Sequence, residues 1–211
     1  DETIFTDSQY DFKTISERIR EMAYLNKALE LSIRDERDDN EKTYYFEGGI
    51  ASFVHSLNRN RLVVHRLPIY VSKAINSTQV EVAFQYNDGF AETIFSFANC
   101  VNTIDGGSHL TGFRTALTRV LNDCARKGKL IKEDDPNLTG EDVREGLTAI
   151  VSVKLSEPQF EGQTKGKLGN PEIKGIVESA VVEGLTLHLE EHPDDLKRII
   201  DKCLLAARAR E

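Results

Sequence analysis

Residues 147–155 have the sequence LTAIVSVKL, an apolar and β-branched run interrupted by a single charge. A strand with one solvated face would alternate polar and apolar side chains, so this run predicts a strand that is buried on both faces at the centre of a sheet. Helical and strand-like segments flank it on both sides. Together they predict an α+β fold, a sheet backed by helices.

Apolar residues at helical spacing predict helices on both sides of this strand. They are expected over 11–26, 50–58, 108–126, 171–191 and 194–210. Ser108 is expected to cap the third helix, and the segment Thr139-Gly-Glu-Asp142 to lead into a further short one. Alternating patterns predict two hairpins, one joining 29–33 to 43–46 and one joining 80–86 to 93–97 through the turn Asn87-Asp88-Gly89.

The chain lacks a convincing linker, an internal repeat and a low-complexity tract. We therefore expect a single domain over 1–211, with a helix-hairpin subregion over 1–49 and a final helix over 192–211. No apolar run reaches the length that a bilayer requires. The acidic start, Asp1-Glu-Thr-Ile-Phe5, has no signal-peptide pattern and no Met, which suggests a fragment. Three scattered cysteines favour a reducing cytoplasm over disulfides or a zinc site.

Basic residues are concentrated locally, although the net charge is −8. Residues 48–80 contain no acid and four bases, and residues 109–132 contain six bases and one acid. Because salt screens charges over about 10 Å, a polyanion would respond to such local strips rather than to the total. A solvated helix face is the alternative interpretation of the same pattern.

The loop over 161–169, EGQTKGKLG, superficially resembles a Walker A phosphate loop. The spacing of Gly162 and Gly166 is one residue too short, and Leu168 stands where the motif needs Ser or Thr. Gln163 and Lys165 nevertheless lie two positions apart, which in extended backbone places both on one side, where they could donate to phosphate oxygens. The alternative is a plain surface loop.

The pentapeptide His188-Leu-Glu-Glu-His192 fits the inverted zincin pattern, in which two helical histidines bind zinc and Glu191 acts as general base. It lies at a helix end just before Pro193, where histidine is also electrostatically favourable. No third ligand is identifiable in the sequence. A zinc peptidase therefore remains only an alternative, and we expect no metal site.

Several stretches, in order along the chain, resemble the transducer, or second, domain of the DNA gyrase B subunit, a bacterial type II topoisomerase. They are Ile19-Arg-Glu-Met-Ala-Tyr-Leu-Asn26, Tyr45-Phe-Glu-Gly-Gly-Ile50, Val82-Ala-Phe-Gln-Tyr-Asn-Asp-Gly89, Asp105-Gly-Gly-Ser-His-Leu-Thr-Gly-Phe-Arg114, Arg144-Glu-Gly-Leu147, Val151-Ser-Val-Lys154, Pro158-Gln-Phe-Glu-Gly-Gln-Thr-Lys165 and Ala206-Ala-Arg-Ala-Arg-Glu211. The resemblance implies a two-layer fold similar to the ribosomal S-five second-domain-like class, with a left-handed crossover.

In that family the Gln-Thr-Lys loop reaches the γ-phosphate of ATP in the neighbouring ATPase domain, which assigns this contact to Gln163 and Lys165. The family also lines a cavity between paired subunits with arginines that meet DNA. This implies Arg114 as a DNA contact and makes Arg119, Arg126, Arg208 and Arg210 further candidates, together with Lys127. Gly166 departs from the family, where a charged residue is common, and loosens the loop.

The resemblance further implies a cytoplasmic isomerase that uses ATP with Mg²⁺. Its expected partners are its own ATPase and TOPRIM domains, a second B subunit, the gyrase A subunit and double-stranded DNA, with no membrane. The ATPase and TOPRIM domains are missing here, so the fragment alone should bind no cofactor and catalyse nothing. The matching domain in the topoisomerase IV homologue of the gyrase B protein is the nearest alternative, and an RNA-binding module of the same fold is an alternative of another class.

Overall fold

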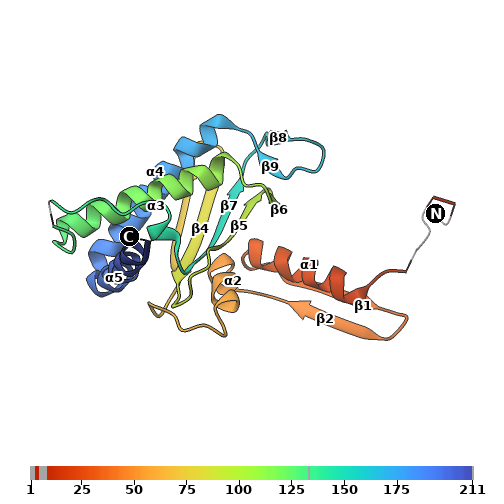
Figure 1. Ribbon diagram of the computed structural model, residues 1–211. Helices are drawn as coiled ribbons and strands as arrows, with labels where there is room; N and C mark the ends of the chain where they lie inside the picture. Colours follow the sequence, from red (N-terminus) through yellow and green to blue (C-terminus); the bar gives the residue numbers. More distant parts are fainter. Residues whose placement is uncertain (1–2, 5–8, 133, 211) are drawn as a thin grey trace. The chain divides into compact units, whose positions relative to one another are not determined.

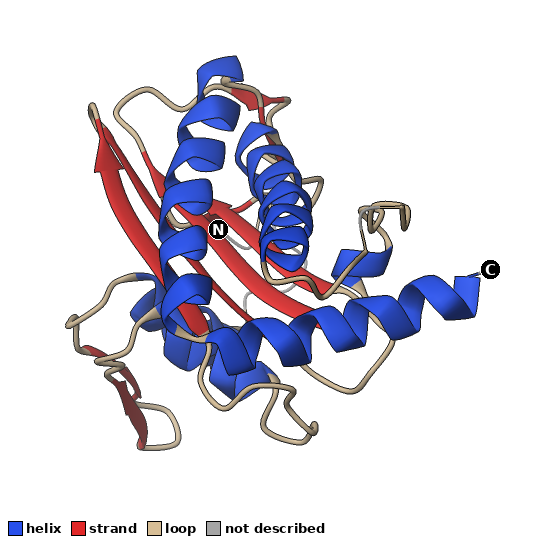
Figure 2. Ribbon diagram, turned by 90° about the vertical axis from the view of Figure 1, so that its left-hand side faces the viewer, coloured by secondary structure: helices blue, strands red, loops and turns tan. Residues whose placement is uncertain are grey.

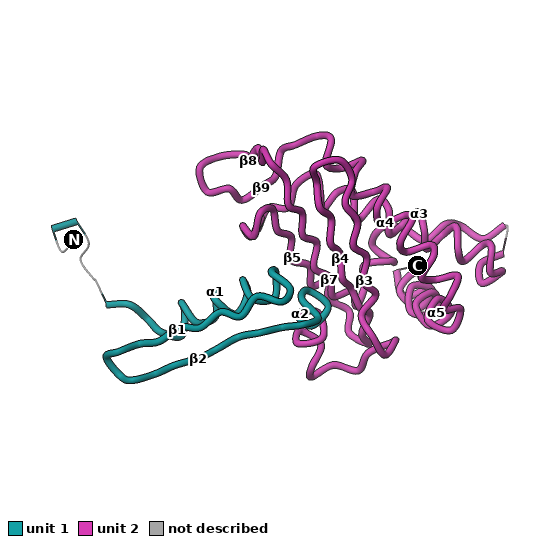
Figure 3. Tube along the Cα trace, turned by 180° about the vertical axis from the view of Figure 1, so that it is seen from behind, with its two compact units in different colours: residues 1–52 teal, residues 53–211 magenta. Residues whose placement is uncertain are grey.

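The computed structural model describes residues 3–4, 9–132 and 134–210 (Figure 1). The chain divides into two compact units, residues 1–52 and residues 53–211 (Figure 3). Asp1, Glu2 and Phe5, part of the acidic start considered above, lie outside the described residues, and so does Glu211. The expectations that concern these four positions therefore stay predictions.

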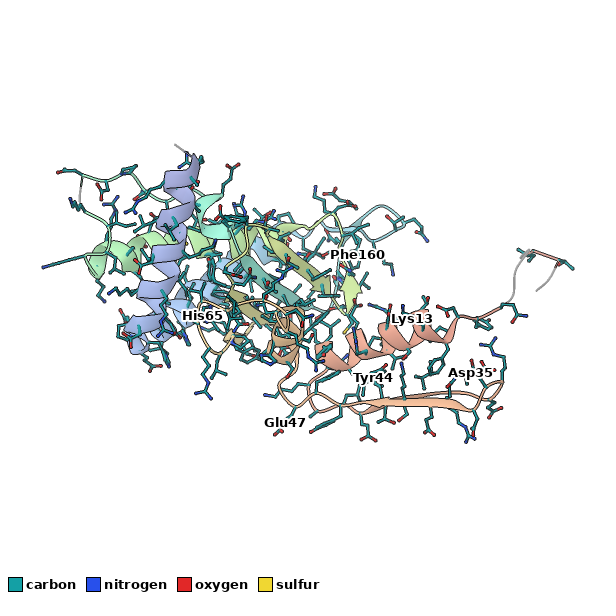
Figure 4. The ribbon with its side chains drawn as sticks, turned by 60° about the horizontal axis from the view of Figure 1, so that its bottom comes forward. Lys13, Asp35, Tyr44, Glu47, His65 and Phe160 are labelled. Atoms are coloured by element: carbon teal, nitrogen blue, oxygen red, sulfur yellow. The ribbon has the colours of Figure 1, made fainter. Side chains whose placement is uncertain are left out.

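The first unit combines one helix with one hairpin, as the sequence predicts. Its elements are α1 (Phe12–Leu25), β1 (Leu31–Asp35) and β2 (Asn40–Tyr44), and β1 pairs antiparallel with β2. Asp11 caps α1 by accepting hydrogen bonds from the Lys13 and Thr14 amides. Tyr44 joins the helix to the hairpin, because its hydroxyl lies 2.7 Å from Ser16 Oγ (Figure 4).

A five-stranded sheet forms the centre of the second unit. Its strands are β3 (Ile69–Ile75), β4 (Thr78–Tyr86), β5 (Thr93–Ala98), β6 (Val101–Asn102) and β7 (Leu147–Lys154), in the order β3-β4-β7-β5-β6. The strand β7 is central and buried on both faces, which confirms the prediction for residues 147–155. Only the β5–β7 pair is parallel. The fold is thus α+β with a mixed sheet.

The predicted hairpin between 80–86 and 93–97 is wrong. The strands β4 and β5 do not pair with each other, because both pair with β7, one on each side. The turn chemistry at Asn87 is real, since its Oδ1 accepts a hydrogen bond from the Gly89 amide at 2.9 Å. However, Asn87 N bonds to Gly146 O, which attaches the turn to the start of β7. The sequence analysis also missed β3.

Helices pack on one face of the sheet, where Figure 2 shows long helices lying across the strands. The helices are α2 (Ile50–Leu57), α3 (Ser108–Lys127), η1 (Asp142–Arg144), α4 (Pro171–Glu191) and α5 (Pro193–Arg210). The core beneath them contains Val82, Phe84, Phe113, Leu117 and Val151. Ser108 does not cap α3, because Gly107 is the N-cap residue and makes no side-chain bond. In the part of the chain that the structure describes, no helix is long and apolar enough to cross a bilayer.

Four buried polar side chains hold the segment after α2 against the start of β7. Asn58 donates to Gln85 Oε1 at 3.0 Å, while its own Oδ1 accepts from Asn87 at 3.1 Å and from Thr148 Oγ1 at 2.9 Å. Each of these groups is buried, so satisfying them in a closed network avoids the cost of burying polar atoms without partners. This network had no signal in the sequence.

Two glycines of the helix pair α3–α4 should respond in opposite directions to alanine. A Cβ at Gly112 would lie 2.4 Å from Lys174 O, so Gly112→Ala should force the helices apart and destabilise the fold by about 2 kcal/mol. A Cβ at Gly175 would meet nothing within 4 Å, so Gly175→Ala should stabilise it by about 0.5–1 kcal/mol. Urea unfolding of both variants measures this, and a shift of the same sign for both would contradict it.

Candidate functional site

A short hairpin following β7 displays the Gln-Thr-Lys sequence. It consists of β8 (Phe160–Glu161) and β9 (Lys167–Leu168), with Phe160 paired to Leu168 (Figures 1 and 4). Its base is fixed, because the Leu168 amide donates to Gly106 O at 3.1 Å and the Asp105 amide donates to Gly166 O at 2.9 Å. The hairpin is therefore attached to the loop that opens α3.

The tip of the hairpin is a tight turn with exposed side chains. The Lys165 amide donates to Gly162 O at 3.3 Å, and Lys165 has a φ of 55°. The extended backbone assumed for this segment is therefore wrong, since a left-handed residue ends the turn. Gln163 and Lys165 are both exposed, and the Lys165 ammonium lies 5.8 Å from the centre of the Phe160 ring. A rigid base thus presents an amide and an ammonium to the surroundings.

The helix start beside this base contains a buried histidine. His109 is fully buried, its Nε2 lies 3.1 Å from Thr103 Oγ1, and its Nδ1 has no hydrogen-bond partner among the described residues. Burial disfavours the imidazolium and lowers the pKa of His109 to about 4. Burial likewise lowers the pKa of His65. Both rings are therefore neutral at pH 7.

We expect the fold to lose stability between about pH 6.5 and pH 4. A group whose pKa is lower in the folded state than in the unfolded state takes up its proton mainly on unfolding, so acid favours the unfolded chain. For His109 the difference amounts to about 3 kcal/mol, complete near pH 4. Urea unfolding across this range measures it, and His109→Gln should flatten the slope. An equal slope in that variant would contradict this assignment.

The arginines expected on α3 differ in what surrounds them. Arg114 donates to Glu92 Oε1 at 2.7 Å, whereas Arg119 lies 3.6 Å from Glu178 and 3.8 Å from Asp123 and is more than half exposed. Both border a groove of about 540 Å³ beside the helix. Their guanidinium groups are therefore accessible to an anion.

Two other predicted arginines are engaged within the chain. Arg126 donates to Asn137 Oδ1 and to the carbonyls of Lys132 and Asp135. Arg210 binds both carboxylate oxygens of Asp142, at 3.0 and 3.2 Å. Burial raises the pKa of Asp142, but Arg210 and hydrogen bonds from Thr139 outweigh it and lower that pKa. These arginines shape the fold. Arg208 is exposed near the end of α5.

The histidine pair at the end of α4 is stacked rather than spread around a metal. The rings of His188 and His192 lie 4.2 Å apart and nearly parallel, and His192 Nδ1 lies 2.9 Å from His188 O. Among residues 3–4, 9–132 and 134–210, no three His, Cys, Asp or Glu side chains are placed to hold a metal ion. The described geometry gives the zincin pattern no third ligand.

Sequence reasoning overlooked two residues of the α3 groove. Arg144 of η1 approaches Glu92 Oε1 to 3.4 Å, so Glu92 lies between Arg144 and Arg114. Arg144 is close in sequence to the strand β7, but nothing in its spacing relates it to α3. Only the fold brings these residues together.

The comparisons with known proteins agree on one family. The family model described as DNA gyrase B matches residues 49–211. The chain is 58% identical to the DNA gyrase B protein of Clostridium acetobutylicum and 53% identical to that of Halalkalibacterium halodurans, in each case over the whole chain. It spans about a third of the length of these curated relatives, 33% of each.

Solved structures lead to the same result. The structure of the 43K ATPase domain of Thermus thermophilus gyrase B in complex with an aminocoumarin superposes with a TM-score of 0.90 and 41% identity, over 100% of this chain and 57% of that one. The topoisomerase IV ATP binding domain of Francisella tularensis superposes with a TM-score of 0.86 and 25% identity, over 100% of this chain and 57% of that one. The chain belongs to the DNA gyrase B family.

Proposed function

We propose that this chain is the transducer domain of a DNA gyrase B subunit. In this role it couples ATP binding and hydrolysis in an adjacent ATPase domain to clamping of the dimer and to DNA strand passage. We assign its sheet and helices to the ribosomal S-five second-domain-like class with a left-handed crossover. Matching 57% of a gyrase ATPase-region structure supports a role for the chain as one part of that region. The likeness to a topoisomerase IV structure keeps that enzyme as the alternative.

The hairpin over 160–168 is the observation on which the proposal rests. Its tip exposes Gln163 and Lys165, while its base is bonded to the loop over 105–107 that opens α3. Lys165 would contact the γ-phosphate of ATP, held with Mg²⁺ by the neighbouring domain, and stabilise the negative charge of phosphoryl transfer. Loss of that phosphate would release the tip, and the bonded base would transmit the change to α3.

The α3 arginines support the second half of the proposal. Arg114 and Arg119 are accessible to DNA phosphates, Arg208 is a further candidate, and Arg126 and Arg210 contribute less because they have partners within the chain. Contacts of this kind are independent of base sequence and weaken as salt rises. The proposed assembly contains a second B subunit, the gyrase A subunit and duplex DNA, with the ATPase and TOPRIM domains beside this one, in the cytoplasm. The chain alone would be inactive.

The test is nucleotide-dependent closure of the full-length protein that carries this sequence. Gln163→Ala should weaken dimer closure, followed by energy transfer between labelled subunits, with a non-hydrolysable ATP analogue. Gln159→Ala is the matched control, because it removes the same side chain from the exposed base of the same hairpin. Equal closure in both variants would refute the proposed contact.

A further inference from the structure

The groove beside α3 contains more positive charge than its carboxylates neutralise. Arg114, Arg119 and Arg144 face it, and Glu92 is the carboxylate that both Arg114 and Arg144 approach. Each guanidinium offers five N–H donors. The Nε atoms of Arg114 and Arg144 are buried and have no hydrogen-bond partner among the described residues. Donors buried in this way favour an incoming group rich in acceptor oxygens.

The walls of this groove are fixed before any ligand arrives. Asn122 of α3 forms two hydrogen bonds with the main chain of Leu138, donating to its carbonyl at 3.0 Å and accepting from its amide at 2.8 Å. Arg126 holds the preceding residues through Asn137 Oδ1 at 2.7 Å. Little ordering is therefore needed when a ligand binds, which favours affinity.

A glycine makes room for one of the guanidinium groups. A Cβ at Gly140 would lie 2.6 Å from Arg144 Nη1, so the bare backbone lets that group lie flat against the wall. The side chain of Arg144 is only 24% exposed, against 60% for Arg119 at the rim. Arg144 is thus positioned inside the groove, rather than extending freely into solvent.

We propose that Arg114 and Arg144 together bind one backbone phosphate of duplex DNA, and that Glu92 is the internal counter-ion that this phosphate displaces. The proposal rests on the function proposed above and adds to it a second arginine, a competitor and a defined site. A phosphate fits because it presents several acceptor oxygens to two forked donors at once. The groove volume of about 540 Å³ admits the backbone and leaves Arg119 at the entrance for an adjacent phosphate.

The variants Arg144→Gln and Glu92→Gln should act in opposite directions on DNA affinity. In the full-length protein, titrated with a short fluorescent duplex, Arg144→Gln should weaken binding about tenfold and reduce the salt slope by about one. Glu92→Gln should tighten binding several-fold, because it removes the competing carboxylate. If both variants weaken binding, the pair has only a structural role and the proposal fails.

Two further variants separate position and charge from overall stability. Gly140→Ala keeps every charge but displaces the Arg144 guanidinium, so it should weaken DNA binding with little change in the unfolding midpoint. Arg59→Gln removes one exposed positive charge elsewhere and should change affinity less than twofold. Equal losses for Arg59→Gln and Arg144→Gln would indicate a diffuse field and overturn the proposal.

Inorganic phosphate identifies the source of the ligand. If free phosphate at millimolar concentration displaces the duplex from the parent protein but not from Arg144→Gln at the same ionic strength, the groove is a phosphate site that DNA occupies. If free phosphate has no effect that depends on Arg144, the phosphate assignment is wrong. ATP turnover of Lys165→Ala provides the independent check, because an effect there with none for Arg144→Gln would refute this site alone.

Discussion

Lys165→Ala should lower ATP turnover of the full-length protein about 10²–10³-fold, since a single cationic donor at a developing phosphoryl charge contributes this much to transition-state stabilisation. The side chain is exposed at the tip of the hairpin and contacts no core residue other than the half-buried Phe160 ring. The unfolding midpoint should therefore stay unchanged. Steady-state turnover and a nucleotide-binding titration together measure the effect.

The control is Lys167→Ala, two residues along the same hairpin. Lys167 is also exposed, but its ammonium lies 3.1 Å from Glu161 and belongs to the strand pair, not to the tip. Its removal costs one surface ion pair, an effect of at most about 1 kcal/mol on stability and little on turnover. If the two variants lose turnover equally, the loss reflects general positive charge, and the proposed contact is wrong.

Gly107→Ala should destabilise the fold by about 3 kcal/mol and detach the hairpin from α3. Gly107 has a φ of 141°, which L side chains rarely adopt, and a Cβ there would lie 2.5–2.9 Å from the main chain of Leu168. Backbone atoms cannot move aside as a flexible side chain can. Hydrogen exchange of the Leu168 amide, which bonds to Gly106 O, reports the detachment, and urea unfolding reports the cost.

Gly162→Ala separates backbone strain from collision. Gly162 also has a positive φ, 75°, but a Cβ there meets nothing within 4 Å. Its replacement should cost about 1 kcal/mol, and the Leu168 amide should remain protected. Equal costs for the two variants would mean that the contact between Gly107 and Leu168 contributes nothing.

The elements governed by local patterns were predictable from sequence. The β-branched run of β7 and the helical spacing of α3, α4 and α5 agree with the structure because burial on these elements follows short periods. Strand pairing does not follow from such periods. The turn residues at Asn87 suggested a hairpin, whereas the non-local preference of two apolar strands for β7 decided the pairing.

The candidate site divides in the same way. Gln163 and Lys165 were identified because they are adjacent in sequence, and their tight turn was missed because it depends on the left-handed Lys165. The groove was only partly predictable. Glu92 and Arg144 are more than 50 positions apart, and they meet Arg114 only because β5 and η1 converge on α3.

The bonds that hold the hairpin base to the start of α3 make this helix a lever arm. A helix of 20 residues is about 30 Å long, so a tilt of about 10° at its first turn would move its last turn by about 5 Å. Arg114 lies near the pivot and Arg126 near the moving end. An angular input too small to disturb the hairpin itself would thus be amplified along the helix, with its largest stroke at the loop that Arg126 holds.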